Sequence, residues 1–228
     1  MVQRITISPQ QQQGSLIVLR SDQVHYLVRV LRLQRGDRFI AQNGQGQQWL
    51  AKLGEQSDRA QILEELIASD SQPFPPIRLI AALPKGNGFD QVVRQTTELG
   101  VSHIYPVITE RTLLRPSESK LARWRRIAEE ASEQSERVTV PTISEPVDFQ
   151  QCIEHPAWTK SENSLEEELR CLCTARSVCE SAQNPQLLAH LLTHQSADCA
   201  PANLRSVILA IGPEGGWTQS EITVAMAC

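Results

Sequence analysis

Several features that would place the chain in a common protein class are missing from its 228 residues. No apolar run approaches the roughly 20 residues that a membrane-spanning helix needs. The first residues, Met1–Thr6, alternate in polarity like a strand and lack the apolar core of a signal peptide. These absences predict a protein that works in the cytoplasm without a membrane anchor.

The cysteines form none of the patterns that hold a zinc ion or a network of disulfides. They contain no C-x-x-C motif, and all lie in the last third of the chain, at positions 152, 171, 173, 179, 199 and 228. Scattered thiols of this kind are typical of a reduced cytosolic protein. His190 and His194 are four residues apart in a helical pattern, but no third candidate ligand is near in sequence. We therefore predict no metal site.

The chain also lacks the overall basic charge of many nucleic-acid-binding proteins. Its net charge is −4 at pH 7, and residues 141–228 carry 4 Lys or Arg against 11 Asp or Glu. With 40% hydrophobic and 21% charged residues, the composition is that of a folded globular protein. Any contact with a nucleic acid must therefore come from a local group of basic side chains.

Residues 1–72 have the pattern of a small β-barrel with one helix. The segment Asn43-Gly44-Gln45-Gly46 is a strong hairpin signal, and the glutamine run at 10–13 is predicted to be a polar loop. Ser21 is the expected N-cap of the helix, whose apolar stripe at i, i+3, i+4 and i+7 consists of Val24, Leu27, Val28 and Leu31. Strands are expected at Gln3–Ile7, Leu16–Leu19, Asp37–Gln42, Gln48–Leu53 and Ala60–Leu66.

After the stiff, proline-rich segment 73–76, strands alternate with helices, which indicates a parallel α/β sheet. A helix through Phe89 and Leu99 should stop at Gly100, and a long helix is expected at Ser117–Glu136. Glu130, Gln134 and Arg137 would share one face near the end of that long helix. The strands are expected at Ile77–Leu83, His103–Val107, Leu169–Cys173 and Val207–Ile211.

A glycine-rich turn, residues 212–217, follows the last of these strands. Thr218 and Glu221 have the spacing of a capping box, so a helix should begin directly after the turn. Ligands of parallel sheets bind at this position, beyond the carboxyl ends of the strands. The turn is neither G-x-G-x-x-G nor a P-loop, and Glu214 would repel a phosphate. A neutral or cationic ligand fits it better, with glycines at positive φ that let the ligand approach the backbone.

The turn and several other motifs resemble the RsmE family of 16S ribosomal RNA methyltransferases. The sequence Ile-Gly-Pro-Glu-Gly-Gly followed by Trp217 resembles the cofactor loop of that family. Further similar motifs are Ala82–Gly86, Glu98–Val101, Arg123-Trp124, Glu130-Ala131 with Gln134 and Arg137, and Val140-Pro141. His25–Arg32 with Gly36-Asp37 resembles the PUA-like domain of the family. Gln95 departs from the pattern, since the family often has lysine at this position.

The resemblance implies an α/β fold in two domains: a PUA-like RNA-binding β-barrel at 1–72, joined by the linker 73–76 to a SPOUT domain at 77–228. A SPOUT domain contains a trefoil knot, an exception to the rule against knots, and works as a homodimer. The cofactor implied is S-adenosylmethionine (SAM), and the partner is 16S ribosomal RNA of the small subunit. The reaction implied is methylation of N3 of a uridine.

The resemblance also implies roles for individual residues. SAM is expected to contact Thr174, Ile211, Gly212, Pro213, Glu214, Gly215 and Gly216. RNA is expected to contact Arg4, Arg29, Arg32, Arg35, Lys85, Arg111 and Gln134. Arg137, helped by Glu130, is expected to stabilise the charge that develops on the uracil as its N3 proton leaves.

The residues alone leave simpler interpretations open. The arginines could form a solvated helix face, although the first 38 residues contain six arginines and no lysine, and arginine suits bidentate contact with phosphate. Glu130 and its neighbours could be an ordinary salt-bridged helix end, and the glycine turn could be only a turn.

The family continues beyond the position of Cys228 with a segment that closes the knot and completes the SAM pocket. We therefore expect a C-terminally truncated member with an incomplete knot, poor SAM binding and weak dimerisation. The alternative is a non-catalytic RNA-binding protein of the same fold. A third class, an enzyme that binds nucleotide phosphates, is disfavoured by Glu214.

Overall fold

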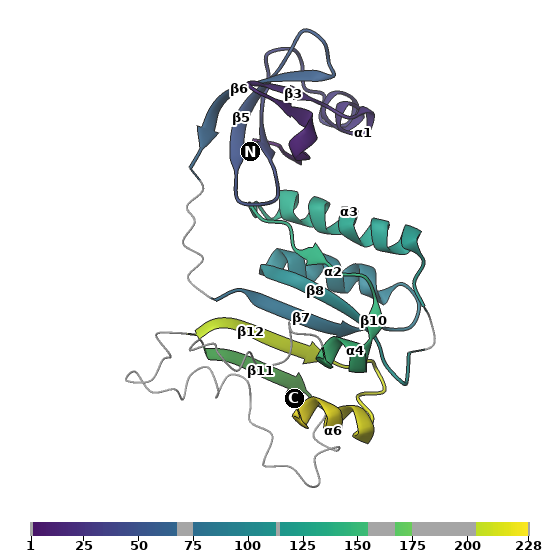
Figure 1. The fold of residues 1–228 in the computed structure, drawn as a ribbon. Coiled ribbons are helices and arrows are strands. Elements are labelled where there is room, and N and C mark those ends of the chain that lie inside the picture. Colours follow the sequence, from purple (N-terminus) through teal and green to yellow (C-terminus); the bar gives the residue numbers. More distant parts are fainter. Residues whose placement is uncertain (1, 68–74, 113–114, 155–166, 175–203, 228) are drawn as a thin grey trace. The chain divides into compact units, whose positions relative to one another are not determined.

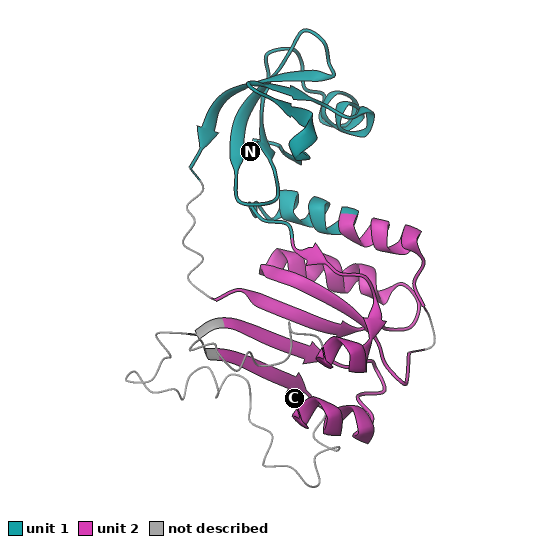
Figure 2. Ribbon diagram, in the orientation of Figure 1, with its two compact units in different colours: residues 1–71, 126–140 teal, residues 72–125, 141–228 magenta. Residues whose placement is uncertain are grey.

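The structure, a computed structural model, describes residues 2–67, 75–112, 115–154, 167–174 and 204–227 (Figure 1). The chain divides into two compact units (Figure 2). Unit 1 consists of Met1–Ser71 and Arg126–Val140, and unit 2 of Gln72–Arg125 and Pro141–Cys228. Helix α3 (Glu118–Gln134) contributes to both units, because the division falls after Arg125. Within the described ranges, no helix is both long and apolar enough to span a membrane.

Unit 1 contains a six-stranded sheet with the order β1-β4-β5-β6-β3-β2. Strand β1 runs parallel to β4, and the other pairs are antiparallel. In the described residues β1 and β2 are not paired with each other, so the sheet is an open half-barrel. The strands are β1 (Arg4–Thr6), β2 (Gln12–Gln13), β3 (Leu16–Val18), β4 (Arg38–Gln42), β5 (Gln48–Leu53) and β6 (Arg59–Leu66).

The prediction of a polar loop for the glutamine run was wrong. Pro9–Gln11 forms a short 3₁₀ helix, η1, and Gln12–Gln13 pairs with β3. The reason is that Gln11 is buried and donates its side-chain amide to the Val18 carbonyl at 2.8 Å and to Gln23 Oε1 at 2.7 Å. These bonds replace the water that an exposed glutamine would bind.

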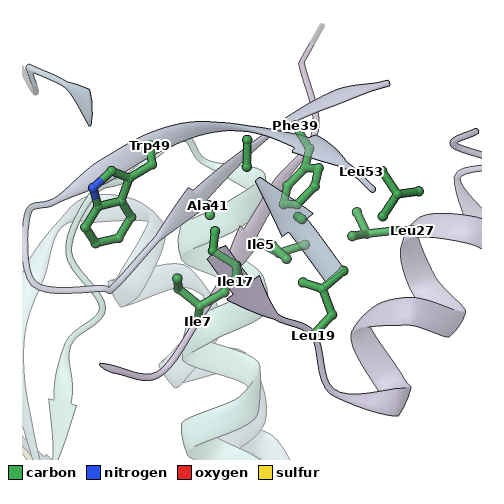
Figure 3. Close-up of a cluster of buried hydrophobic side chains, with 11 residues drawn as sticks. Ile5, Ile7, Ile17, Leu19, Leu27, Phe39, Ala41, Trp49 and Leu53 are labelled. Carbon is green, nitrogen blue, oxygen red and sulfur yellow. The ribbon is translucent and has the colours of Figure 1, made fainter. Parts of the chain in front are cut away.

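The predicted helix is present as α1 (Ser21–Val24) and continues as a π-helical segment, η2 (His25–Val30). The prediction of Ser21 as N-cap was wrong by one residue, because Arg20 keeps an extended backbone and caps the helix. Its apolar stripe covers the core of unit 1, as the spacing predicted. Leu27 is fully buried and projects toward Phe39 and Leu53 of the sheet (Figure 3). The buried core consists of Ile5, Ile7, Ile17, Leu19, Leu27, Phe39, Ala41, Trp49, Ala51, Leu53 and Ala60.

Unit 2 contains a parallel sheet with the order β10-β8-β7-β12-β11, to which β9 is added by pairing with β8. All its pairs are parallel, as the alternation of strands and helices predicted. The strands are β7 (Ile77–Ala82), β8 (Val101–Ile108), β9 (Thr142–Ile143), β10 (Val147–Asp148), β11 (Glu167–Cys173) and β12 (Leu204–Ile211). Its other helices are α2 (Gly88–Leu99), α4 (Phe149–Glu154) and α6 (Gln219–Ala227).

The ends of the helices follow the sequence signals in one case and depart from them in another. Helix α2 ends at Gly100, whose φ of 90° gives the left-handed cap that was predicted. Helix α3 ends at Gln134, before its predicted end, and Glu136 has a φ of 59°. Arg137 therefore lies beyond the helix and does not continue the face of Glu130 and Gln134. Its amide donates to the Ser132 carbonyl at 2.9 Å and closes the helix end.

Candidate functional site

The glycine-rich turn, here called the glycine loop (Gly212–Trp217), lies where four neighbouring strands end. The register aligns Cys173 of β11 with Ile211 of β12, and Ile211 with Ala81 of β7. Strand β8 ends beside β7, with Val107 opposite Ala82. Because all these strands are parallel, the residues that follow them meet at one edge of the sheet. This edge is where open parallel sheets bind ligands.

The capping box after the glycine loop is present with both of its hydrogen bonds. Glu221 Oε2 accepts the Thr218 amide at 2.8 Å, and Thr218 Oγ1 accepts the Glu221 amide at 3.2 Å. The other carboxylate oxygen, Glu221 Oε1, accepts the amide of Glu110 at 2.9 Å, from the turn after β8. Glu221 is 7% exposed, so both oxygens of a buried carboxylate are satisfied by backbone N–H groups.

The other strand-end segments also bond to the glycine loop. The amide of Lys85, after β7, donates to Glu214 Oε1 at 3.1 Å. The guanidinium of Arg111, after β8, donates to the carbonyl of Gly215 and, at 3.5 Å, to that of Gly216. The indole of Trp217 donates to the carbonyl of Cys173, at the end of β11, at 3.0 Å. The loop thus forms hydrogen bonds with the segments that follow β7 and β8 and with the last residue of β11.

Trp217 anchors the glycine loop by packing into the core of unit 2. Its ring is buried and stacks on Phe149, with centroids 4.3 Å apart. A Cβ at Gly212 would lie 3.1–3.2 Å from three atoms of the indole, so any larger residue would require the Trp217 ring to shift by a few tenths of an ångström. The prediction of positive φ holds for Gly216 alone, at 70°, and was wrong for Gly212 and Gly215.

The groups at this edge suit a neutral or cationic ligand with an apolar part. Ile211 is 46% exposed although it ends an otherwise buried strand, and it offers an apolar surface beside the loop. The Glu214 carboxylate is exposed, and Thr174 is partly exposed at the end of β11. Among the described residues, no three His, Cys, Asp or Glu side chains gather closely enough to hold a metal ion. His190 and His194 lie outside the described residues.

The residues predicted to contact RNA lie in different environments. Arg29 and Arg32 are exposed at the end of η2, and Arg32 has a φ of 58°. Arg35 is exposed and forms an ion pair with Glu55. The Arg4 side chain is only 15% exposed and pairs with Glu136 at 3.1 Å, so little of its guanidinium can reach RNA. Lys85 and Arg111 belong to the strand-end edge of unit 2.

The predicted catalytic residues lie in unit 1, whereas the glycine loop lies in unit 2. Glu130 pairs with Arg126 at 2.9 Å, four residues earlier on α3, which is the ordinary helix ion pair considered as the alternative. Gln134 is exposed at the last turn of α3. Arg137 is partly exposed beyond the end of that helix.

Two carboxylates on α3 were missed by the sequence analysis. Burial raises the pKa of Glu133 and of Glu129 above their ordinary values. Glu133 Oε1 accepts the Thr6 amide at 2.5 Å, which joins α3 to β1 within unit 1. Their spacing of four residues on the buried side of a helix was the available signal. The interior position of that side depends on the distant strand β1, which the local pattern does not reveal.

Known proteins resemble the chain over its whole length. The family described as "RNA methyltransferase domain" matches residues 70–228, and "RNA methyltransferase PUA domain" matches residues 19–65. Ribosomal RNA small subunit methyltransferase E of Synechocystis sp. is 41% identical over all of this chain and 69% of its own length. The Bacillus subtilis protein of the same name is 25% identical over 90% of this chain and 76% of its own.

Solved structures share the fold. The Neisseria gonorrhoeae ribosomal RNA small subunit methyltransferase E, bound to SAM, has a TM-score of 0.74 and 25% identity. The match covers 100% of this chain and 86% of that one. A putative methyltransferase of Legionella pneumophila in complex with SAM has a TM-score of 0.73 at 25% identity, with the same coverage.

Proposed function

Because the chain belongs to the family of ribosomal RNA small subunit methyltransferase E, we propose that it transfers a methyl group from SAM to N3 of a uridine in 16S ribosomal RNA. The observation that carries this proposal is the glycine loop, which lies at the carboxyl edge of a parallel sheet and forms hydrogen bonds with the segments after β7 and β8 and with the last residue of β11. Two structural relatives with this fold are described with SAM bound.

The residues of the edge fit SAM. Backbone carbonyls and the exposed Glu214 carboxylate suit a sulfonium cation, and the exposed Ile211 side chain suits an adenine ring. When bound, SAM supplies an electrophilic methyl group. We assign Thr174, Ile211, Gly212, Pro213, Glu214, Gly215 and Gly216 to holding it.

Side chains of the protein have to accept the proton of uracil N3 and to stabilise the negative charge that its loss leaves on the base. Uracil N3 carries a proton that must leave before the nitrogen can act as a nucleophile, and negative charge then spreads onto O2 and O4. We assign Arg137 to stabilising that charge by charge-assisted hydrogen bonds. Glu130, which is ion-paired with Arg126, assists as a proton acceptor directly or through water.

We assign RNA contacts to Arg29, Arg32 and Arg35 of unit 1, together with Lys85 and Gln134. The first three are exposed arginines within seven residues of chain, so they can contact successive phosphates. Arg111 was expected to bind RNA, but its guanidinium donates to two carbonyls of the glycine loop, and we assign it to holding the loop. The family resemblance also supports a homodimer, which light scattering after gel filtration tests.

A labelled methyl group tests the reaction. The purified chain is incubated with methyl-tritiated SAM and either 16S ribosomal RNA or small subunits, and the RNA is then reverse-transcribed. Methylation of N3 blocks the pairing edge of the base, so we expect tritium in the RNA and a stop one nucleotide before a single uridine. RNA binding without tritium transfer would instead support the non-catalytic alternative, and absence of SAM binding would contradict the cofactor assignment.

A further inference from the structure

We propose that Glu221 is a positioning residue for the glycine loop, and that its hydrogen bond to the Glu110 amide sets the affinity for SAM. The inference rests on the proposed function, because that function assigns the loop to SAM. It concerns residues that are not expected to touch the cofactor themselves.

The capping box uses only one of the two oxygens of the Glu221 carboxylate. One oxygen accepts the Thr218 amide, which is all that a helix start needs from this position. The second oxygen accepts an amide 111 residues away in sequence, that of Glu110. A carboxylate that is 7% exposed has no water to replace this partner. The bond therefore holds together the start of α6 and the turn after β8.

The turn after β8 is itself internally braced. The Thr112 amide donates to the Thr109 carbonyl at 2.9 Å, which makes Thr109–Thr112 a β-turn with Glu110 at its second position. The Thr109 amide donates to Thr112 Oγ1 at 3.0 Å, and the two hydroxyls lie 2.9 Å apart. The backbone of Glu110 is thus fixed by the residues on both sides.

The same turn also contacts the middle of the glycine loop. Arg111, next to Glu110, reaches the carbonyls of Gly215 and Gly216 with its guanidinium. The turn thereby holds the loop at two places, through Arg111 at its centre and through Glu221 just beyond its end. If the hydrogen bond to Glu221 is broken, the braced turn keeps its shape but loses one of its two attachments beside the loop, so the whole turn, with Arg111, is held less firmly against the loop.

Because the loop contains two adjacent glycines, its conformation depends on the contacts made through Arg111 and Glu221. Gly215 and Gly216 have no side chains to restrict their backbone, and glycine samples more conformations than any other residue. A loop that populates its binding conformation only part of the time binds its ligand more weakly in proportion to that fraction. The Glu110–Glu221 bond therefore preorganises the loop for SAM.

A matched pair of substitutions at one position breaks this hydrogen bond with or without loss of the side chain. Glu110→Pro removes the N–H donor and puts the ring Cδ in its place, which also pushes the Glu221 carboxylate away. Proline is favoured at the second position of a β-turn, so the turn itself should persist. Glu110→Ala removes the side chain and keeps the donor. We expect calorimetric titration with SAM to give a Kd about tenfold higher for Glu110→Pro, because one bond to a charged group is worth roughly this factor. Glu110→Ala should stay within about twofold of the wild type.

A second pair separates positioning from helix stability. Glu221→Gln has one acceptor for two amides and should weaken SAM binding about as much as Glu110→Pro. Thr218→Ala loses the hydroxyl of the capping box but keeps both bonds to the Glu221 carboxylate. It should lower Tm while leaving the Kd within about twofold. At saturating SAM, Glu110→Pro and Glu221→Gln should recover a kcat near that of the wild type, so the change appears in KM for SAM.

The outcomes distinguish this inference from the function on which it rests. If wild-type protein binds SAM and Glu110→Pro binds it as tightly as Glu110→Ala, the positioning role is wrong and the proposed function stands. If Thr218→Ala weakens SAM as much as Glu221→Gln, the effect is helix stability, and the positioning role is again overturned. If the wild type itself binds no SAM, the proposed function fails first and the inference fails with it.

Discussion

The two units bury polar side chains in different places. In unit 1 the buried Gln11, Gln23, Gln42 and Gln48 bond to one another and to the backbone inside the half-barrel. Of the four buried polar side chains described in unit 2, Thr97 and Ser206 lie elsewhere, whereas Thr109 and Glu221 lie at the strand-end edge and form hydrogen bonds with the turn and helix that border the glycine loop.

From this difference we expect the buried polar groups of unit 1 to affect mainly the stability of the fold, and those of unit 2 to affect mainly ligand binding. An unsatisfied group inside unit 1 has no route to water, so removal of its partner should weaken the fold. The bonds of unit 2 hold a loop whose strands are already fixed by the sheet, so breaking them should weaken ligand binding first. In unit 1 the residues proposed to bind RNA are instead exposed side chains on a frame that the buried glutamines stabilise.

The largest effect is expected at Gln23, at the centre of the glutamine network. Its amide donates to the Thr6 carbonyl at 2.8 Å, and its oxygen accepts the Gln11 side chain and, at 2.9 Å, the Arg20 amide. Gln23→Ala leaves these partners unsatisfied, and we expect urea unfolding to show a loss of about 3 kcal/mol. Exposed Gln10→Ala serves as the control. SAM affinity of Gln23→Ala is measured at low temperature. If the binding free energy fell as much as the free energy of unfolding, the idea that unit 1 sets stability and unit 2 sets ligand binding would be wrong.

In the glycine loop, two glycine-to-alanine substitutions sharpen the comparison. A methyl group at Gly212 meets the rigid indole of Trp217 at 3.1–3.2 Å, so Gly212→Ala should destabilise the protein by about 2 kcal/mol and weaken SAM binding. At Gly216 nothing lies within 4 Å, and alanine suffers only the strain of a φ of 70°, about 1 kcal/mol. Equal SAM affinities for the two variants, measured by calorimetry, would show that the Trp217 contact does not shape the site.

The exposed arginines of unit 1 should affect RNA binding without affecting stability. Replacing Arg29 and Arg32 with alanine should reduce the slope of log affinity against log salt by about one for each phosphate that is no longer neutralised. Filter binding to a 16S RNA fragment over a salt series measures this slope. The exposed Arg94→Ala of α2 is the control, and an unchanged slope in the double variant would place the RNA contact elsewhere.

The smallest effect concerns Glu133, the half-buried carboxylate that joins α3 to β1. Because the folded pKa of Glu133 is raised above its ordinary value of 4.5, its contribution to stability is full below pH 4.5 and is lost as pH rises through the folded pKa. Glu133→Gln keeps an acceptor for the Thr6 amide without the charge. We expect its Tm to exceed that of the wild type by about 2 °C at pH 8, with no difference below about pH 4.5. Exposed Glu65→Gln should show no such trend, and a gain of Tm at acidic pH would reverse the sign of this argument.

Local patterns in the sequence predicted most elements of both sheets, the cap at Gly100 and the capping box after the glycine loop. These features depend on residues within a turn or two of each other. The second bond of Glu221 and the bond between Glu133 and Thr6 join residues more than 100 positions apart, and no local pattern specifies them. The early end of α3 also went unpredicted, because Glu136 adopts a left-handed conformation that sequence statistics assign to glycine or asparagine.

The discontinuity of unit 1 has a consequence for the order of events during protein synthesis. Glu133 and Glu136 bond to β1, and the Val140 amide donates to the Gly44 carbonyl at 2.8 Å, so residues 126–140 complete this unit. About 70 residues of chain separate Ser71 from Val140, and a ribosome adding about 5–20 residues per second needs on the order of 3–14 s to cover them. During that interval Arg4 lacks its partner, so the closing contacts of the half-barrel form only after the first 54 residues of unit 2, 72–125, have been translated.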